Sequence, residues 1–152
     1  MTEDDFNALW KNLVKRSHKA DGPPLSEHER RFYAVNLLRG SVPRSGFIGY
    51  FENWNASEIA AAHEGLRALR LLPVLALLEK AQNTVLGGRP LPKDSSRIAV
   101  FPKSLTEEEY ERECNRMDEA LTPIEEEFRK HDDEIWKALC EYADKHQLKP
   151  QG

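Results

Sequence analysis

The chain has 152 residues, of which 39% are hydrophobic and 32% charged, and its net charge is −4. This length can bury a core without disulfides or metal, and no apolar run approaches the roughly 18 residues that a membrane span needs. Because the N-terminus is acidic and Cys114 and Cys140 have no second Cys or His at metal-ligand spacing, we expect a cytoplasmic protein with reduced thiols.

Helical periodicity and capping patterns organise the N-terminal part of the chain. Apolar residues recur at helical spacing over residues 1–18, which predicts a helix capped by Thr2. Ser26 and Glu29 have the spacing of a capping box, in which a hydroxyl and a carboxylate satisfy free backbone N–H groups at a helix start. A second helix is therefore predicted from there to about Leu38.

The segment GSVPRSG predicts the end of that second helix, because Pro43 has no N–H to donate and glycines favour other backbone angles. Asn55 or Ser57 can cap a third helix. Pro73 fits the first turn of a fourth helix, and the glycine pair 87–88 is expected to end it.

Residues 89–103 contain three prolines and no helical period, which indicates a long surface loop with a short extended piece at RIAVF. Thr106 and Glu109 then predict the start of a fifth helix. A cap at Thr122 followed by Pro123 predicts the start of a sixth. The expected fold is all-α, a single-domain bundle of about six helices with the proline-containing loop before the last two.

Two apolar stripes are expected to face the core from the last two helices. His131 falls on the second stripe, and we expect it at the boundary of the core, hydrogen-bonded to a carbonyl or a carboxylate. The two stripes consist of Tyr110, Cys114, Met117 and Leu121, and of Ile124, Phe128, His131, Ile135, Leu139 and Tyr142.

Standard catalytic and metal-binding patterns are missing from the sequence. It has no His-Glu-x-x-His or Glu-x-x-His spacing, no glycine-rich phosphate loop, no Gly-x-Ser-x-Gly elbow and no Cys-x-x-Cys pair. We therefore predict a protein that is not an enzyme, with no catalytic residues, no metal ligands and no cofactor.

Charge is unevenly distributed along the chain. Residues 104–146 contain fifteen Asp and Glu against six Lys and Arg, a local balance of −9, and the remainder has a balance of +5. Acids one helical turn apart, about 5.4 Å, have a spacing broadly similar to that of phosphates along a nucleic-acid strand. The acidic segment is thus either a solubilising surface or a surface that binds a basic partner.

The segment SGFIGYFENW, residues 45–54, combines two glycines with four aromatic rings. Its aromatic side chains can anchor a turn in the core, and its asparagines can bond to nearby backbone and start the next helix. A partner-binding aromatic patch is the alternative. The composition favours the structural role.

A longer pattern surrounds this segment, with LSEHERRFYAVNLLRGSV before it and LEKAQNTVLGG after it. Over residues 25–148 the chain resembles a bacterial DNA-mimic protein family, mostly uncharacterised, with the motif Asn-Gly-Gly-Phe-x-Gln-Tyr-Phe-x-Asn. Arg44, Ser45 and Gly49 depart from this motif. The matching residues are Gly46, Phe47, Tyr50, Phe51 and Asn53.

The resemblance implies an all-helical domain over 25–148, preceded by an amphipathic helix and linker at 1–24. Its named activity belongs to a dimeric protein whose carboxylates imitate DNA phosphates and occupy the DNA-binding surface of a transcription factor. A homodimer of this chain is consistent with the resemblance. On this basis the partner-binding carboxylates are expected to include Glu107, Glu108, Glu111, Glu119, Glu126, Asp133, Glu134 and Glu141.

The leading hypothesis is a non-catalytic interaction protein that binds a protein partner such as a DNA-binding protein. Direct nucleic-acid binding is not expected, since the acidic face repels phosphate, and no membrane association is expected. The first alternative is an antitoxin-like or regulatory module that uses the aromatic turn 46–54 and the loop 89–103. The second is an enzyme with an unfamiliar site beside His63 or His131.

Overall fold

Six helices form the protein, whose computed structural model describes residues 1–19, 22–94, 96–101 and 104–151. No strand occurs among these described residues, which confirms the all-α, single-domain prediction. The helices are α1 (Glu3–Lys19), α2 (Glu27–Asn53), α3 (Ala56–Ala68), α4 (Leu72–Leu86), α5 (Glu107–Arg129) and α6 (Asp132–Lys145).

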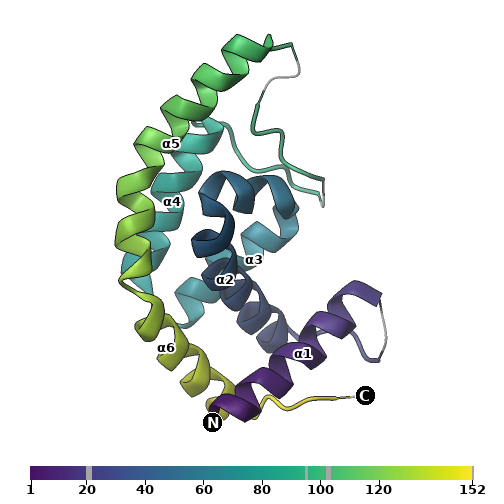
Figure 1. Ribbon diagram of the computed structural model, residues 1–152. Helices are drawn as coiled ribbons and strands as arrows, with labels where there is room; N and C mark the ends of the chain where they lie inside the picture. Colours follow the sequence, from purple (N-terminus) through teal and green to yellow (C-terminus); the bar gives the residue numbers. More distant parts are fainter. Residues whose placement is uncertain (20–21, 95, 102–103, 152) are drawn as a thin grey trace.

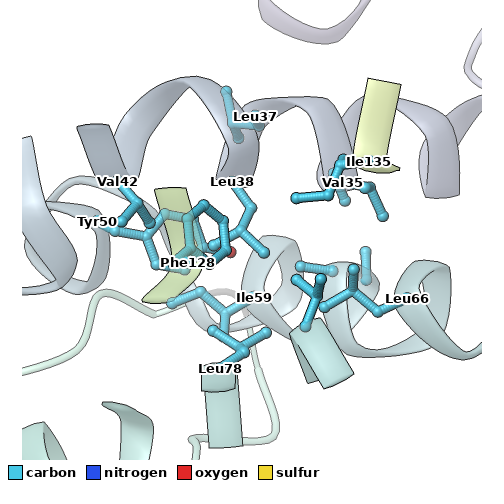
Figure 2. Close-up of a cluster of buried hydrophobic side chains, with 14 of the residues drawn as sticks. Val35, Leu37, Leu38, Val42, Tyr50, Ile59, Leu66, Leu78, Phe128 and Ile135 are labelled. Carbon is cyan, nitrogen blue, oxygen red and sulfur yellow. The ribbon is translucent and has the colours of Figure 1, made fainter. Parts of the chain in front are cut away.

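Helix α2 lies at the centre of the molecule and contacts each of the other five helices (Figure 1). Helices α5 and α6 follow one another along one side, and α4 packs beside α5. Figure 2 shows the core, where buried side chains such as Leu38 of α2, Ile59 of α3, Leu78 of α4 and Phe128 of α5 meet. The apolar faces of the helices therefore converge on α2.

Local capping signals place most of the helix starts as predicted. Thr2 caps α1, accepting a hydrogen bond from the Asp5 N–H at 3.1 Å. Capping boxes open α2 at Ser26 and α5 at Thr106, and Asn55 caps α3. These predictions are confirmed. Each cap depends on a side chain within three residues of the backbone group that it satisfies, so the local sequence is enough to predict it.

The break predicted in GSVPRSG occurs, but at the end of that segment: helical geometry continues past Leu38 and through Pro43, is interrupted at Gly46, and resumes to Asn53. The only non-helical residue inside α2 is Gly46, at φ 69° and ψ 177°, a region that is essentially restricted to glycine. Directly after this kink, the Phe47 N–H donates a hydrogen bond to Glu125 Oε2 at 2.8 Å. A carboxylate from α5 thus replaces a backbone acceptor at the kink.

The predicted helix start at Thr122 and Pro123 is also wrong, since α5 runs through both residues to Arg129. The Thr122 hydroxyl donates to the carbonyl of Asp118 at 2.6 Å instead of capping a new helix. Glu125, three residues after Thr122, instead accepts the hydrogen bond from the Phe47 N–H. The sixth helix begins later, at Asp132.

Seven of the ten residues in the two predicted apolar stripes are buried, whereas Cys114 and His131 are half-buried and Tyr110 is exposed. Tyr110 is 46% exposed, which contradicts its predicted inward position, and it contacts Phe101 with ring centroids 4.9 Å apart. In Figure 1 the first turns of α5 extend beyond the other helices, so no helix covers this residue. His131 lies between α5 and α6, and its Nδ1 bonds to Glu134 Oε2 at 2.6 Å, as expected for a boundary histidine with a carboxylate partner.

The loop before α5 is more than a surface connection. Ile98 and Val100 are buried in the core. The Ala56 N–H donates to the Ser96 carbonyl at 3.1 Å, and a single antiparallel bridge joins Asn55 to Arg97. The short extended piece predicted at RIAVF is therefore limited to this bridge, and residues 102–103 of the loop lie outside the described residues.

Close approach between α2 and α3 depends on a glycine. A Cβ atom at Gly65 would lie 2.6 Å from Val35 Cγ2 and 2.9 Å from the Arg31 carbonyl oxygen. The second distance is to backbone, which cannot yield without moving α2. The absence of a side chain at Gly65 therefore sets how closely α3 packs on α2.

A buried ion pair fixes α1 to the start of α2. The guanidinium of Arg16 donates to both carboxylate oxygens of Glu29, at 2.6 and 2.9 Å, and also to the carbonyls of Pro23 and Pro24. Burial alone would raise the pKa of Glu29, but the hydrogen bonds from Arg16 and from the Ser26 N–H outweigh it and lower the pKa. Arg16 thus holds the α1–α2 connection and the α2 cap together.

The Glu29→Gln substitution should lower the free energy of unfolding by about 3–5 kcal/mol, because it leaves the Arg16 charge buried and unpaired. Because the folded pKa of Glu29 is depressed, its contribution is present above its unfolded pKa and is lost as pH falls through the folded pKa. Urea unfolding between about pH 7 and pH 3 measures both effects. The exposed Glu113–Arg116 pair is the control, and Glu113→Gln should cost less than about 1 kcal/mol.

The Gly46→Ala substitution should destabilise the protein by about 1–3 kcal/mol, because alanine is strained at this backbone conformation. Its Cβ would also lie 2.6 Å from Glu125 Oε2. Gly40 is the matched control, since it lies in the same helix and a Cβ added there would meet nothing within 4 Å. Gly40→Ala should be neutral or stabilising by up to about 1 kcal/mol in urea unfolding, and equal effects at both positions would contradict the assigned kink.

Candidate partner-binding surface

The predicted partner-binding carboxylates lie on the side of the molecule formed by α5 and α6. Figure 1 shows these two helices as one curved edge from the tip of α5 to the end of α6. Every one of the eight residues is exposed: Glu107, Glu108, Glu111, Glu119, Glu126, Asp133, Glu134 and Glu141. We refer to these eight residues as the acidic face.

Three carboxylates of α5 point most directly away from the core. At about 100° per residue, Glu108, Glu119 and Glu126 fall within about 20° of one another and opposite the buried stripe that contains Met117 and Phe128. At about 1.5 Å per residue, they are separated along the helix by about 16.5 and 10.5 Å. They therefore form a line parallel to the axis of α5.

Most of the acidic face is not neutralised within the protein. Glu134 is the exception, since it bonds to His131. The other seven residues form no ion pair or side-chain hydrogen bond with any residue in the described part of the chain. Asp118 is also exposed, but the prediction from the sequence did not include it. It lies seven residues after Glu111, about two helical turns, and so on the same face of α5, which is the signal that could have identified it.

The remaining acids of residues 104–146 have structural partners. The Arg116 guanidinium, 2.7 Å from Glu113, lowers the pKa of that carboxyl. The other partnered acids are Glu109 in the α5 cap, Glu125 on the Phe47 N–H, Glu127 with Lys130, Asp132 with Arg39 and Asp144 with the N-terminal ammonium. The fold thus uses about half of the acids and leaves the others to solvent.

The family-motif segment is placed differently, inside the protein. Phe47, Tyr50 and Phe51 are at most 1% exposed, and burial raises the pKa of the Tyr50 hydroxyl well above its usual range. Gly46 forms the kink of α2, and Asn53, which is exposed, is the last residue of that helix. Three of the four rings are therefore unavailable as a surface patch.

Trp54, the fourth ring of this segment, is half-buried. Its indole N–H donates to the Ser41 hydroxyl at 3.2 Å. The segment 46–54 is thus the end of α2 and its connection to α3, and only Trp54 contributes aromatic surface to solvent. This geometry does not support the alternative in which the aromatic turn binds a partner.

His63 and His131, the histidines of the enzyme alternative, each bond to another side chain of the protein. His63 Nε2 lies 2.7 Å from Gln82 Oε1, which joins α3 to α4, and His131 bonds to Glu134. No group of three or more His, Cys, Asp and Glu that could hold a metal ion occurs among the described residues. In the same part of the chain, no helix combines the length and apolar character needed to cross a membrane.

Comparison with known proteins agrees with the resemblance in the sequence. A family model described as DMP19-like protein matches residues 23–146, which include α2 to α6 and leave α1 outside the match. No curated protein and no solved structure matches the chain. Because the family model covers most of its length, the chain belongs to the family of DMP19-like proteins.

Proposed function

We propose that this chain is a non-catalytic interaction protein that acts as a DNA mimic, presenting the acidic face to a DNA-binding protein such as a transcription factor. The observation that carries this proposal is the line of exposed carboxylates on α5, which have no partner among the described residues. Membership of the DMP19-like family supports it, because a DNA-mimic role is associated with that family.

The dimensions of α5 suit this role. Its 23 residues correspond to a length of about 34 Å, close to one turn of B-DNA. The line of Glu108, Glu119 and Glu126 extends over about 27 Å of this length. A protein surface whose Lys and Arg are arranged for phosphates can therefore meet several of these carboxylates at once.

Local charge supports the role better than total charge does. The net charge is only −4, but residues 104–146 carry a balance of −9. Interactions between exposed charges are screened beyond about 10 Å at ordinary ionic strength, so a partner docked on α5 and α6 experiences mainly the local excess. The same excess opposes direct binding of nucleic acid to this face.

Reversing the charges of the three carboxylates that form a line on α5 tests the proposed function. The variant Glu108→Lys/Glu119→Lys/Glu126→Lys should reduce recovery of the cytosolic partner by tenfold or more at low salt, because it places like charges opposite one another. Recovery by the unmodified protein should fall as salt rises and when duplex DNA is added as a competitor. The measurement is a quantitative pull-down from native cytosol at several salt concentrations.

Glu52→Lys/Glu64→Lys/Glu79→Lys is the matched control, with the same change in net charge at exposed positions on α2, α3 and α4. It should retain the partner. Equal losses in the two triple variants would indicate a dependence on total charge. A partner whose recovery is insensitive to salt and to DNA would contradict the mimic.

A further inference from the structure

A groove runs between α1 and α2, and its lining reaches the start of α6 at Asp132. It consists of two neighbouring hollows of about 730 and 480 Å³, both of which are lined by His18 and Tyr33. Its walls come from the C-terminal half of α1, from α2 over residues 30–44 and from the start of α3. We refer to this depression as the α1–α2 groove.

The middle of the α1–α2 groove is apolar and aromatic. Trp10 stacks on Tyr33 with ring centroids 5.2 Å apart, and Val14 lies one turn further along α1. Leu37 and Trp54 complete this part of the lining. Trp10, Val14 and Trp54 are only partly buried, so the groove leaves apolar surface in contact with water.

Two arginines mark the ends of the groove. Arg30 lines the larger hollow and Arg44 the smaller one, and both are exposed. They are fourteen residues apart on α2, which corresponds to about 21 Å, and their directions differ by about 40°. Neither forms an ion pair with a described residue, whereas Arg16 and Arg39 of the same lining are paired with Glu29 and Asp132.

We propose that the α1–α2 groove binds an amphipathic helical segment of a protein partner, with apolar side chains over the aromatic middle and carboxylates against Arg30 and Arg44. A helix of about fourteen residues spans the distance between the two arginines. Apolar anchors at helical spacing, seated in a groove between two helices, are a common mode of peptide recognition. The proposal does not depend on the proposed mimicry, because none of the eight acidic-face residues lines the groove.

Charge inside the groove favours a peptide over nucleic acid. Glu58 lines the larger hollow. Asp132 lines the smaller one. Because Asp132 is paired with Arg39, the repulsion of a continuous phosphate backbone comes from Glu58, which a peptide with separated charges can avoid.

Selection from a display library of random 18-residue peptides tests the proposal. The full chain is the target, and an Arg30→Glu/Arg44→Glu variant is used for counter-selection. Recovered peptides should carry Asp or Glu about fourteen residues apart, with large apolar residues between them. A labelled peptide of this kind should bind the double variant at least tenfold more weakly in fluorescence polarisation.

Arg112→Glu/Arg129→Glu, which changes two exposed arginines of α5, is the matched control and should bind the same peptide normally. Replacing the two peptide carboxylates by lysine should restore binding to Arg30→Glu/Arg44→Glu. Failure to recover such peptides, or equal binding to all variants, would overturn the proposal. It would also be overturned if a labelled 20-nucleotide single strand bound the groove arginines and no peptide did.

Discussion

One hydrogen bond, from the Phe47 N–H to the carboxylate of Glu125, orders much of this structure. It stabilises the kink that Gly46 introduces into α2, the helix that every other helix contacts. It also fixes the rotation of α5, because Glu125 must face α2. On a helix with about 100° per residue, this rotation directs Glu108, Glu119 and Glu126 to solvent. The placement of the acidic face therefore follows from the packing of α5, in which the contact to α2 and the buried stripe of Met117, Leu121, Ile124 and Phe128 agree.

The molecule presents two surfaces with different physical character. The acidic face, on α5 and α6, has an excess of carboxylates with little apolar area, which suits a partner that recognises spaced charge. The α1–α2 groove is apolar and aromatic with an arginine at each end, which suits a partner that inserts side chains. Because the two surfaces share no residue, one chain has the means to bind two different kinds of partner segment.

The sequence predicted those features that depend on neighbouring residues. Caps at Ser26, Asn55 and Thr106 were found because the side chain and the backbone group are three residues apart. The helix end near Leu38 and the helix start at Thr122 and Pro123 are predicted wrongly, because a proline inside a helix is tolerated when tertiary contacts compensate. The partner of the Phe47 N–H at the kink, Glu125, is 78 residues away. The exposed acids could be predicted from helical spacing, whereas the groove could not, since it forms only when α1 packs against α2.

Carboxyl footprinting of the chain in its complex with the cytosolic partner tests the central claim most directly. In this measurement, accessible Asp and Glu are converted to amides with a carbodiimide and an amine, and the extent of labelling at each position is read by mass spectrometry. Partner binding should strongly reduce labelling of Glu108, Glu119 and Glu126 and leave Glu52 and Glu64 unchanged. Unchanged labelling along α5 in a saturated complex would show that the partner binds elsewhere and would contradict the account.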